Sequence, residues 1–550
     1  MANIMSMADI KNRPSRNGFD LSNKKNFSAK VGELLPVMTK VVLPGDSFKI
    51  NFKSFTRTQP LNTSAFARMR EYYDFYFVPF EQLWNKFDSV IVQMNENVQH
   101  ASGPNLDDNV TLSGSLPYFT CQQVADYLYK LSAESDTGVD KNAFEFSRAM
   151  ASSKLLQYLG YGNFTGYAGA EYDWNTKSML HNLNLSVFPL LAYQKIYSDF
   201  YRYTQWERTN PSTFNCDYVK GTSDLNLDIS SYWNSSDENF FDLRYCNYQK
   251  DLFHGVLPQP QFGMGAVAPL VGNVDGDSFA SNAGVAILSL RQAEFMQKWK
   301  EIAMAGEQDY KSQVQKHWGI SVSDYLSHQS RYLGGCATSL DINEIVNTNI
   351  TGDNAADIAG KGTFSGNGTI HFESKGEYGI LMCIYHVLPI PDYVTSGVDC
   401  SCTLTEAVSF PIPELDKVGM ELVPLVRLMN PITGTYENIN NSTFVGYAPR
   451  YIDWKTDVDR SVGAFSSTLG SWCLPINDKL AISALNTGFP TPSGVDQESI
   501  GSGFFKVNPH IVDSLFAVNA GDTVDTDQLL CSSFFDIKVV RNLDTDGLPY

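Results

Sequence analysis

The sequence predicts an all-β fold with helical insertions, organised as one large antiparallel sandwich. Three observations favour this class: apolar alternation with a period of two near both ends of the chain, helical periodicity confined to its middle, and the lack of a repeat of fixed period. A length of 550 residues would by itself suggest about three or four domains. Strands at both ends with helices between them fit a single sandwich with long excursions better than a string of domains.

The first strands are expected in residues 34–59, where two alternating runs flank a Pro-Gly-Asp turn at 44–46. A third strand is expected at 70–78. Pro79 closes it, because proline cannot donate to a strand ladder and is well suited to the first turn of a helix. Apolar residues at helical spacing then predict a helix over about 83–94.

The strand at 70–78 is unusual because it carries aromatic rings on both faces. At a period of two, one face consists of Tyr73, Phe75 and Phe77, and the other of Tyr72, Asp74, Tyr76 and Val78. A half-buried strand would show one polar face. The composition alone leaves open what covers the second face.

Helical patterns and long polar loops fill the middle of the chain. Helices are expected at 121–131, 145–160, 190–207 and 288–304. The last of these has one apolar stripe, formed by Leu288, Phe295, Trp299 and Ile302. The loops at 210–240 and 258–284 are long for a compact protein, and such loops are usually functional or disordered.

From about residue 330 the pattern becomes almost purely β. Residues 376–390 are apolar on both faces, as in a strand at the centre of a sandwich. Further strands are expected at 445–455 and 534–541.

The charge of the chain is distributed unevenly. The net charge is −19, yet residues 1–60 hold ten Lys or Arg against four Asp or Glu. Residues 1–30, which are also rich in Asn and Ser, are interpreted as a flexible basic arm on an acidic body. A solvated tail without a partner is the alternative interpretation.

The motifs predict neither catalysis nor a cofactor nor a metal site. The glycine-rich stretch at 360–370 lacks the Ser or Thr of a phosphate-binding loop and reads as a hairpin, and no GxSxG or HExxH occurs. The nine cysteines contain no CxxC pair. The first residues have no apolar segment of a secretory signal, and no apolar run approaches 18 residues, so no membrane span is expected. Aromatic surface, long loops and a basic arm without a catalytic signature indicate an assembly protein.

Four stretches resemble microvirus major capsid proteins, particularly those of gokushovirus-like phages, and they occur in the same order. The first runs from "RPSRNGFDLSNKKNFSAK" to "YYDFYFVPFEQLW" over residues 13–84. The others are 290–335, which begins "LRQAEFMQKWKEIAMAGEQDY", "VGYAPRYIDWK" at 445–455, and "DQLLCSSFFDIKVVRNLDTDGLPY" at 527–550.

The resemblance implies an eight-stranded antiparallel jelly roll of viral capsid type. After the arm, residues 31–550 would form a single capsid domain with insertions at roughly 80–330 and 395–440. Pentamers of the chain would build a small non-enveloped icosahedral (T=1) shell around a circular single-stranded DNA genome, assembled in the cytoplasm of the bacterial host.

The resemblance also implies partners and candidate residues. A small basic DNA-packaging protein is expected, and so is a host-surface receptor, with 205–285 as the candidate exposed loop. A loop that only clamps neighbouring subunits is the alternative interpretation of that segment. The candidates for DNA contact are Lys11, Arg13, Arg16, Lys24, Lys25 and Lys30. The candidates for contacts between subunits are Tyr72, Tyr73, Phe75, Tyr76 and Phe77.

Two other function classes compete with this interpretation. A carbohydrate-binding or glycoside-cleaving β-sandwich would also use exposed aromatic rings, in a groove that pairs them with carboxylates. A cellular scaffold protein would leave the four ordered stretches unexplained.

Overall fold

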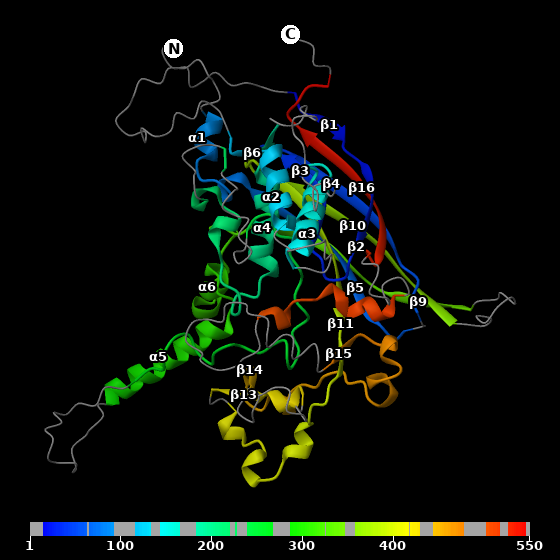
Figure 1. Cartoon of the computed structure of the whole chain (residues 1–550). Helices are drawn as coiled ribbons and strands as arrows, with labels where there is room; N and C mark the ends of the chain where they lie inside the picture. Colours follow the sequence, from blue (N-terminus) through cyan, green and yellow to red (C-terminus); the bar gives the residue numbers. More distant parts are fainter. Residues whose placement is uncertain are drawn as a thin grey trace.

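The computed structural model of the chain is built around two antiparallel β-sheets that pack face to face (Figure 1). It describes residues 15–62, 65–92, 116–133, 144–164, 183–219, 226–227, 239–267, 287–324, 326–346, 358–416, 419–429, 444–477, 502–516 and 526–545.

The larger sheet has six strands, and its order is β1-β16-β4-β10-β9, with β2 also paired to β16. Its strands are β1 (Asn17–Asp20), β2 (Asn23–Ala29), β4 (Ser47–Thr58), β9 (Asp341–Val346), β10 (Ile358–Glu373) and β16 (Leu529–Arg541). The last long strand, β16, thus lies between β4 on one side and β1 and β2 on the other. This pairing joins the two ends of the chain in one sheet.

The smaller sheet has four strands in the order β3-β11-β5-β8. They are β3 (Leu35–Val42), β5 (Arg68–Pro79), β8 (Arg331–Ser339) and β11 (Gly379–Ile390). Strand β11 is buried along almost its whole length and pairs with β5 over twelve residues, as the apolar pattern of 376–390 predicts for a central strand.

Aromatic rings fill the space between the two sheets. The Phe52 ring of β4 lies 5.4 Å from that of Phe75 in β5, and the Phe77 ring lies 4.7 Å from that of Phe372 in β10. Within this layer the hydroxyls of Tyr73 and Ser533 are hydrogen-bonded at 2.7 Å. These two buried hydroxyls are therefore paired with each other, as burial away from water favours.

Three further sheets have two strands each. They pair β6 (Tyr118–Thr120) with β7 (Asn184–Ser186), β12 (Asp392–Val394) with β15 (Pro475–Asn477), and β13 (Met420–Pro424) with β14 (Phe444–Pro449). The prediction of a mostly β chain with helices is confirmed. The eight-strand count is not confirmed, because within the described residues the two main sheets together hold ten strands, two of which come from the amino-terminal segment.

Five of the helices in the described residues lie where the helical periodicity predicts them, two of them with shorter bounds, whereas the helix at 310–318 was not predicted. The helices are α1 (Phe87–Val92), α2 (Cys121–Ala133), α3 (Phe144–Leu159), α4 (Phe188–Ile196), α5 (Ile287–Ala305) and α6 (Tyr310–Trp318). Pro79 is followed by a 3₁₀ turn, Phe80–Gln82, before the short α1 begins. The helix expected at 190–207 is α4 continued by a π-turn, Tyr197–Tyr201.

Helices of the insertion cover the outer face of the four-stranded sheet. Helix α4 packs on β5 and β11, and α3 packs on β3. The ring of Tyr76 in β5 lies 4.8 Å from that of Phe200, and its hydroxyl donates to the Tyr201 hydroxyl at 2.9 Å. Both aromatic faces of β5 are thus buried within one chain, one by the opposite sheet and the other by the insertion.

This burial bears directly on the candidates for subunit contacts. Tyr73, Phe75, Tyr76 and Phe77 are at most 3% exposed. These four side chains have no free surface for a second subunit, so the structure does not support that role for them. Tyr72 is half-buried and stacks on the imidazole of His386 at 4.9 Å, and its role in an interface stays a prediction.

The outer face of β5 also contains a buried carboxyl group, Asp74. It accepts hydrogen bonds from the hydroxyls of Tyr332 at 3.1 Å and Tyr201 at 3.3 Å. Burial raises the pKa of Asp74 from 3.8 to about 6, because the surroundings disfavour the charged form. Burial also lowers the pKa of the neighbouring His386 to about 3, so this imidazole is neutral at pH 7 and supplies no compensating charge.

Asp74→Asn is therefore expected to stabilise the folded chain at pH 7.5. The folded-state pKa of Asp74 exceeds its unfolded value, so ionisation costs stability as the pH rises from about 4 through 6. We expect the variant to gain about 3 kcal/mol of unfolding free energy at pH 7.5 and much less at pH 4. Denaturant unfolding at the two pH values measures this, with the exposed Asp88→Asn as the control. A gain of the same size at both pH values would contradict the assignment.

Candidate nucleic-acid interface

The outer face of the six-stranded sheet is open and carries basic and aromatic side chains. Strand β4 alternates strictly: Phe48, Ile50 and Phe52 point into the sandwich and are buried. The residues between them point outward, and of these Lys49, Lys53, Phe55 and Arg57 are exposed. In Figure 1 helices α2, α3 and α4 lie on the other side of the sandwich, away from β16 and β10.

Strand register aligns these residues with others that are distant in sequence. Lys53 of β4 lies opposite Phe534 of β16, which in turn lies opposite Lys24 of β2. On its other side Lys53 lies opposite Asn367 of β10. Because neighbouring strands are about 4.8 Å apart, this row of four residues spans roughly 15 Å across the sheet.

Adjacent rows extend the same chemistry. Phe55 lies between Ser532 of β16 and Ser365 of β10, and Lys49 lies between Lys538 and His371. Phe55 is 41% and Phe534 45% exposed, so each offers a ring to solvent. We call Lys24, Lys49, Lys53, Phe55, Arg57 and Phe534 the basic–aromatic face.

The four cations of this face are not neutralised by carboxylates. Lys538 is held by Asp20 and by Asp536, the latter at 3.3 Å. Among the described residues, by contrast, no carboxylate lies within ion-pair distance of Lys24, Lys49, Lys53 or Arg57. The guanidinium of Arg57 sits 5.0 Å from the centre of the Phe55 ring, which orders both side chains. The face is thus a local positive patch on a chain whose net charge is −19.

This arrangement suits a single-stranded nucleic acid. Lys and Arg pair with phosphates without reading sequence, and exposed rings stack on unpaired bases, at about 1–3 kcal/mol for each base. An open sheet face with alternating cations and rings provides both interactions on one surface. A duplex, whose bases are already stacked on one another, would use only the cations.

The structure separates the sequence-predicted DNA candidates. Lys24 is exposed and belongs to the basic–aromatic face. Arg16 is exposed, and its guanidinium donates to the carbonyl of Gly45 at 3.2 Å. Lys30 is half-buried next to Glu33, whose carboxylate accepts from the Lys30 backbone N–H at 2.9 Å.

Lys25 points to the opposite side of β2. Its ammonium group donates to the carbonyl of Tyr158 in α3 at 3.0 Å and lies 5.2 Å from that ring. Burial lowers the pKa of Lys25 to about 8. Lys25 therefore anchors α3 to the sheet edge, which leaves it little freedom to bind phosphate. Lys11 and Arg13 lie outside the described residues.

The expected flexible arm is also in part a component of the sheet. Residues 17–29 form β1 and β2, which pair with β16 along its length. This half of the arm is therefore ordered by main-chain hydrogen bonds, and only its earlier part, outside the described residues, remains an expectation.

Sequence reasoning missed most of the basic–aromatic face. A signal existed in "SFKINFKSFTRT", where Lys49, Lys53 and Arg57 recur every four residues and so share one side of a strand. The alignment of Phe534 and Lys24 with Lys53 had no such signal, because it depends on pairing between the two ends of the chain.

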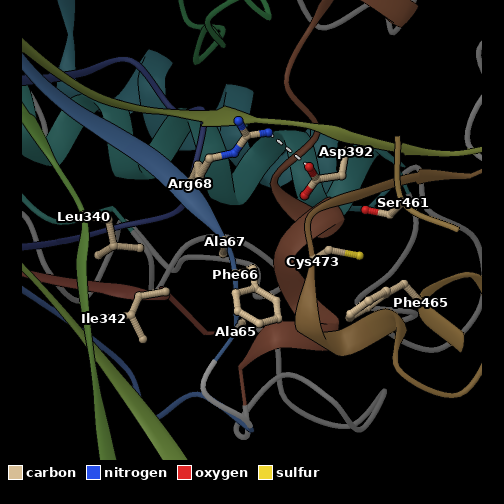
Figure 2. Close-up of a pocket in the computed structure, with 10 residues that line it drawn as sticks. All are labelled: Ala65, Phe66, Ala67, Arg68, Leu340, Ile342, Asp392, Ser461, Phe465 and Cys473. Atoms are coloured by element: carbon tan, nitrogen blue, oxygen red, sulfur yellow. Dashed lines mark hydrogen bonds and ion pairs between the residues drawn. The ribbon is translucent and has the colours of Figure 1, made fainter. Parts of the chain in front are cut away.

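A second surface feature is a pocket of about 500 Å³ at the start of β5 (Figure 2). The exposed Phe66 ring forms part of its wall, 5.8 Å from the ring of Trp472, and Arg68 pairs with Asp392 at 3.1 Å. Asp392 is the only carboxylate among the lining residues, whereas glycoside cleavage needs a carboxyl group on each side of the bond. The pocket does not favour the glycoside-cleaving alternative.

The described residues also bear on membrane crossing and on metal binding. No helix in this part of the chain combines the length and apolar character that a bilayer crossing requires. No three His, Cys, Asp or Glu side chains gather there closely enough to hold a metal ion.

Comparison with known proteins decides the class of this chain. The family model described as "Capsid protein (F protein)" matches residues 8–145 and 272–550, which is most of the chain. The chain belongs to this phage capsid protein family.

A relative supports the same conclusion. The chain is 22% identical to the capsid protein VP1 of Chlamydia phage 1 over 525 residues, which cover 84% of this chain and 87% of the relative. The predicted resemblance to microvirus major capsid proteins is thereby confirmed. As a capsid protein the chain is a structural component that assembles into the virion. The family match omits residues 146–271, which contain much of the candidate exposed loop at 205–285.

Replacing three cations of the basic–aromatic face should weaken binding of single-stranded DNA by this capsid protein. Lys49→Gln, Lys53→Gln and Arg57→Gln together remove up to three phosphate contacts. The slope of log affinity against log salt should then fall by about 2. Fluorescence anisotropy of unassembled subunits with a labelled oligothymidylate, over a salt series, measures both quantities.

The matched control removes the same charge from another surface. Arg291→Gln, Lys298→Gln and Lys316→Gln also replace one exposed Arg and two exposed Lys, on α5 and α6. We expect this control to leave the salt slope unchanged. Equal losses in the two triple variants would mean that overall charge, and not this face, governs binding.

Proposed function

We propose that this capsid protein assembles, through pentamers, into a small icosahedral (T=1) shell around circular single-stranded DNA. The basic–aromatic face lines the interior of that shell. The observation that carries the proposal is the asymmetry of the sandwich: insertion helices cover the outer face of one sheet, whereas the outer face of the other is open and holds uncompensated cations beside exposed rings. The two facing sheets serve as a jelly-roll scaffold for this arrangement.

The charge distribution supports an inward orientation of this face. A chain of net charge −19 repels nucleic acid over most of its surface, so DNA contacts concentrate where the sign reverses. The few cations of one face cannot balance the phosphates of a whole genome. A small basic packaging protein therefore supplies the remaining positive charge, and assembly takes place in the cytoplasm of the bacterial host.

Host attachment belongs to the insertion in this proposal. The segment at 205–285 overlaps the part that the family match omits, and loops on a rigid scaffold commonly carry recognition. Residues that differ most from the family are the ones expected to adapt to a particular host surface.

Expression of the chain with its genome in a bacterial host tests the proposal. We expect uniform icosahedral particles whose nucleic acid is degraded by a nuclease specific for single strands. The Lys49→Gln, Lys53→Gln, Arg57→Gln variant should yield shells of the same size with less DNA per shell. Negative-stain imaging and the ratio of absorbance at 260 and 280 nm measure size and content. Discrete small oligomers, or full DNA content in the variant, would overturn it.

A further inference from the structure

Exposed apolar side chains concentrate in the region of the chain that contains α5 and α6. Thirteen of the thirty large apolar side chains that are exposed in the described residues lie between 262 and 326. This region contains α5 and α6, and Figure 1 shows α5 as a long helix that projects away from the sheets. Of the residues in α5 only Ala303 and Met304, near its end, are buried.

The apolar stripe predicted for this helix is present, but it meets solvent. Leu288 and Phe295 are each 68% exposed and Trp299 is 48% exposed, with Ile302 half-buried at the base of the stripe. The ring of His317 in α6 stacks on Trp299 at 5.5 Å and covers part of it. No described residue seals the rest of the stripe.

A helix in this position needs a partner. An isolated helix of about this length is marginal in water, because most helical stability in proteins comes from packing of the apolar face. The described segment beside α5 is hydrogen-bonded to it: Ala266 N–H donates to the Gln297 side chain at 3.1 Å, and Phe262 N–H donates to the Lys300 carbonyl at 3.2 Å. These bonds orient the helix and leave its stripe free.

We propose that the apolar stripe of α5, formed by Leu288, Phe295, Trp299 and Ile302, docks onto a second copy of this chain in the assembled shell. The inference rests on the proposed function, because it names one of the surfaces through which shell subunits join. Residues 288, 295 and 302 recur every seven positions, the spacing of the seam that packed helices share.

The area is consistent with a protein partner. A large aromatic side chain buries about 150–250 Å² when it is covered completely. The exposed fractions of the stripe, together with those of Tyr310, Trp318 and Ile320 in or just after α6, then amount to an area on the order of 800 Å², which is what one partner contributes to a standard interface.

The charges around the stripe argue against the other classes of partner. Helix α5 carries Arg291, Lys298 and Lys300 against Glu294 and Glu301, a nearly balanced set. A nucleic-acid site would show a clear excess of cations, and a helix that lies on a membrane would have a polar face rich in Lys and Arg. Two copies of an acidic chain repel each other where their acidic surfaces meet. A surface with balanced charges beside apolar area adds no such repulsion and therefore suits a contact between identical subunits.

A pair of identical substitutions on the two sides of α5 tests the proposal. Leu288→Ser removes a stripe residue, whereas Leu290→Ser removes a leucine of comparable exposure, 57%, that lies about 160° away around the helix axis. Neither position is buried, so both variants should fold. We expect Leu288→Ser to raise the subunit concentration needed for particle formation about tenfold, and Leu290→Ser to leave it unchanged. Sedimentation of particles over a concentration series measures this.

Hydrogen exchange of the wild-type chain gives a second readout that needs no variant. Amides of 287–305 should exchange more slowly in particles than in free subunits. Equal assembly of the two variants, or equal exchange in the two states, overturns the docking proposal while the shell proposal stands. Normal particles of Leu288→Ser that no longer infect would assign the stripe to a host partner and also overturn it. A wild-type chain that forms no particles would contradict both the shell proposal and the docking proposal.

Discussion

The packing of β5 between two covers is the constraint on which the rest of this structure depends. One face of the strand meets the six-stranded sheet through Phe75 and Tyr73, and the other meets the insertion through Tyr76. A strand with rings on both sides has to lie in the middle of three layers. The order sheet, sheet, helix layer follows from that requirement, and among the described residues it leaves the outer face of the six-stranded sheet open.

The covered strand explains why the aromatic composition does not translate directly into subunit contacts. Rings placed at a core between two layers stabilise the single chain, with about 0.5–1.5 kcal/mol per aromatic pair beyond area burial. The surfaces left for assembly are those outside the three layers. One of them is the basic–aromatic face, whose cations and rings suit a single-stranded polyanion. The other is the apolar stripe of α5, which suits a protein surface. The two surfaces differ in charge, so one chain can meet two different neighbours without competition between them.

The amino-terminal segment contributes both to the basic–aromatic face and to the contact between the sheet and α3. Its strands β1 and β2 add to the edge of β16, and this brings Lys24 into line with Phe534 and Lys53. At the same time Lys25 turns inward to α3. Adjacent residues of one basic run therefore have different roles, because successive side chains of a strand point to opposite faces. Composition alone would predict that all the cations of the amino-terminal segment contact DNA.

Local patterns in the sequence determined the class of the fold, the strands from β3 to β5 with their turn, the central position of β11, the main helices and the family. Periodicity and turn chemistry act within about ten residues, so they can be read without the fold. Only the tertiary structure decided which ring faces which cover, that the start of the chain joins its last strand, that β4 and β16 align their cations and rings, and that the stripe of α5 stays exposed. The strand pairings join residues hundreds of positions apart, and the cover of a helix depends on how whole segments pack, so local periodicity cannot reveal either.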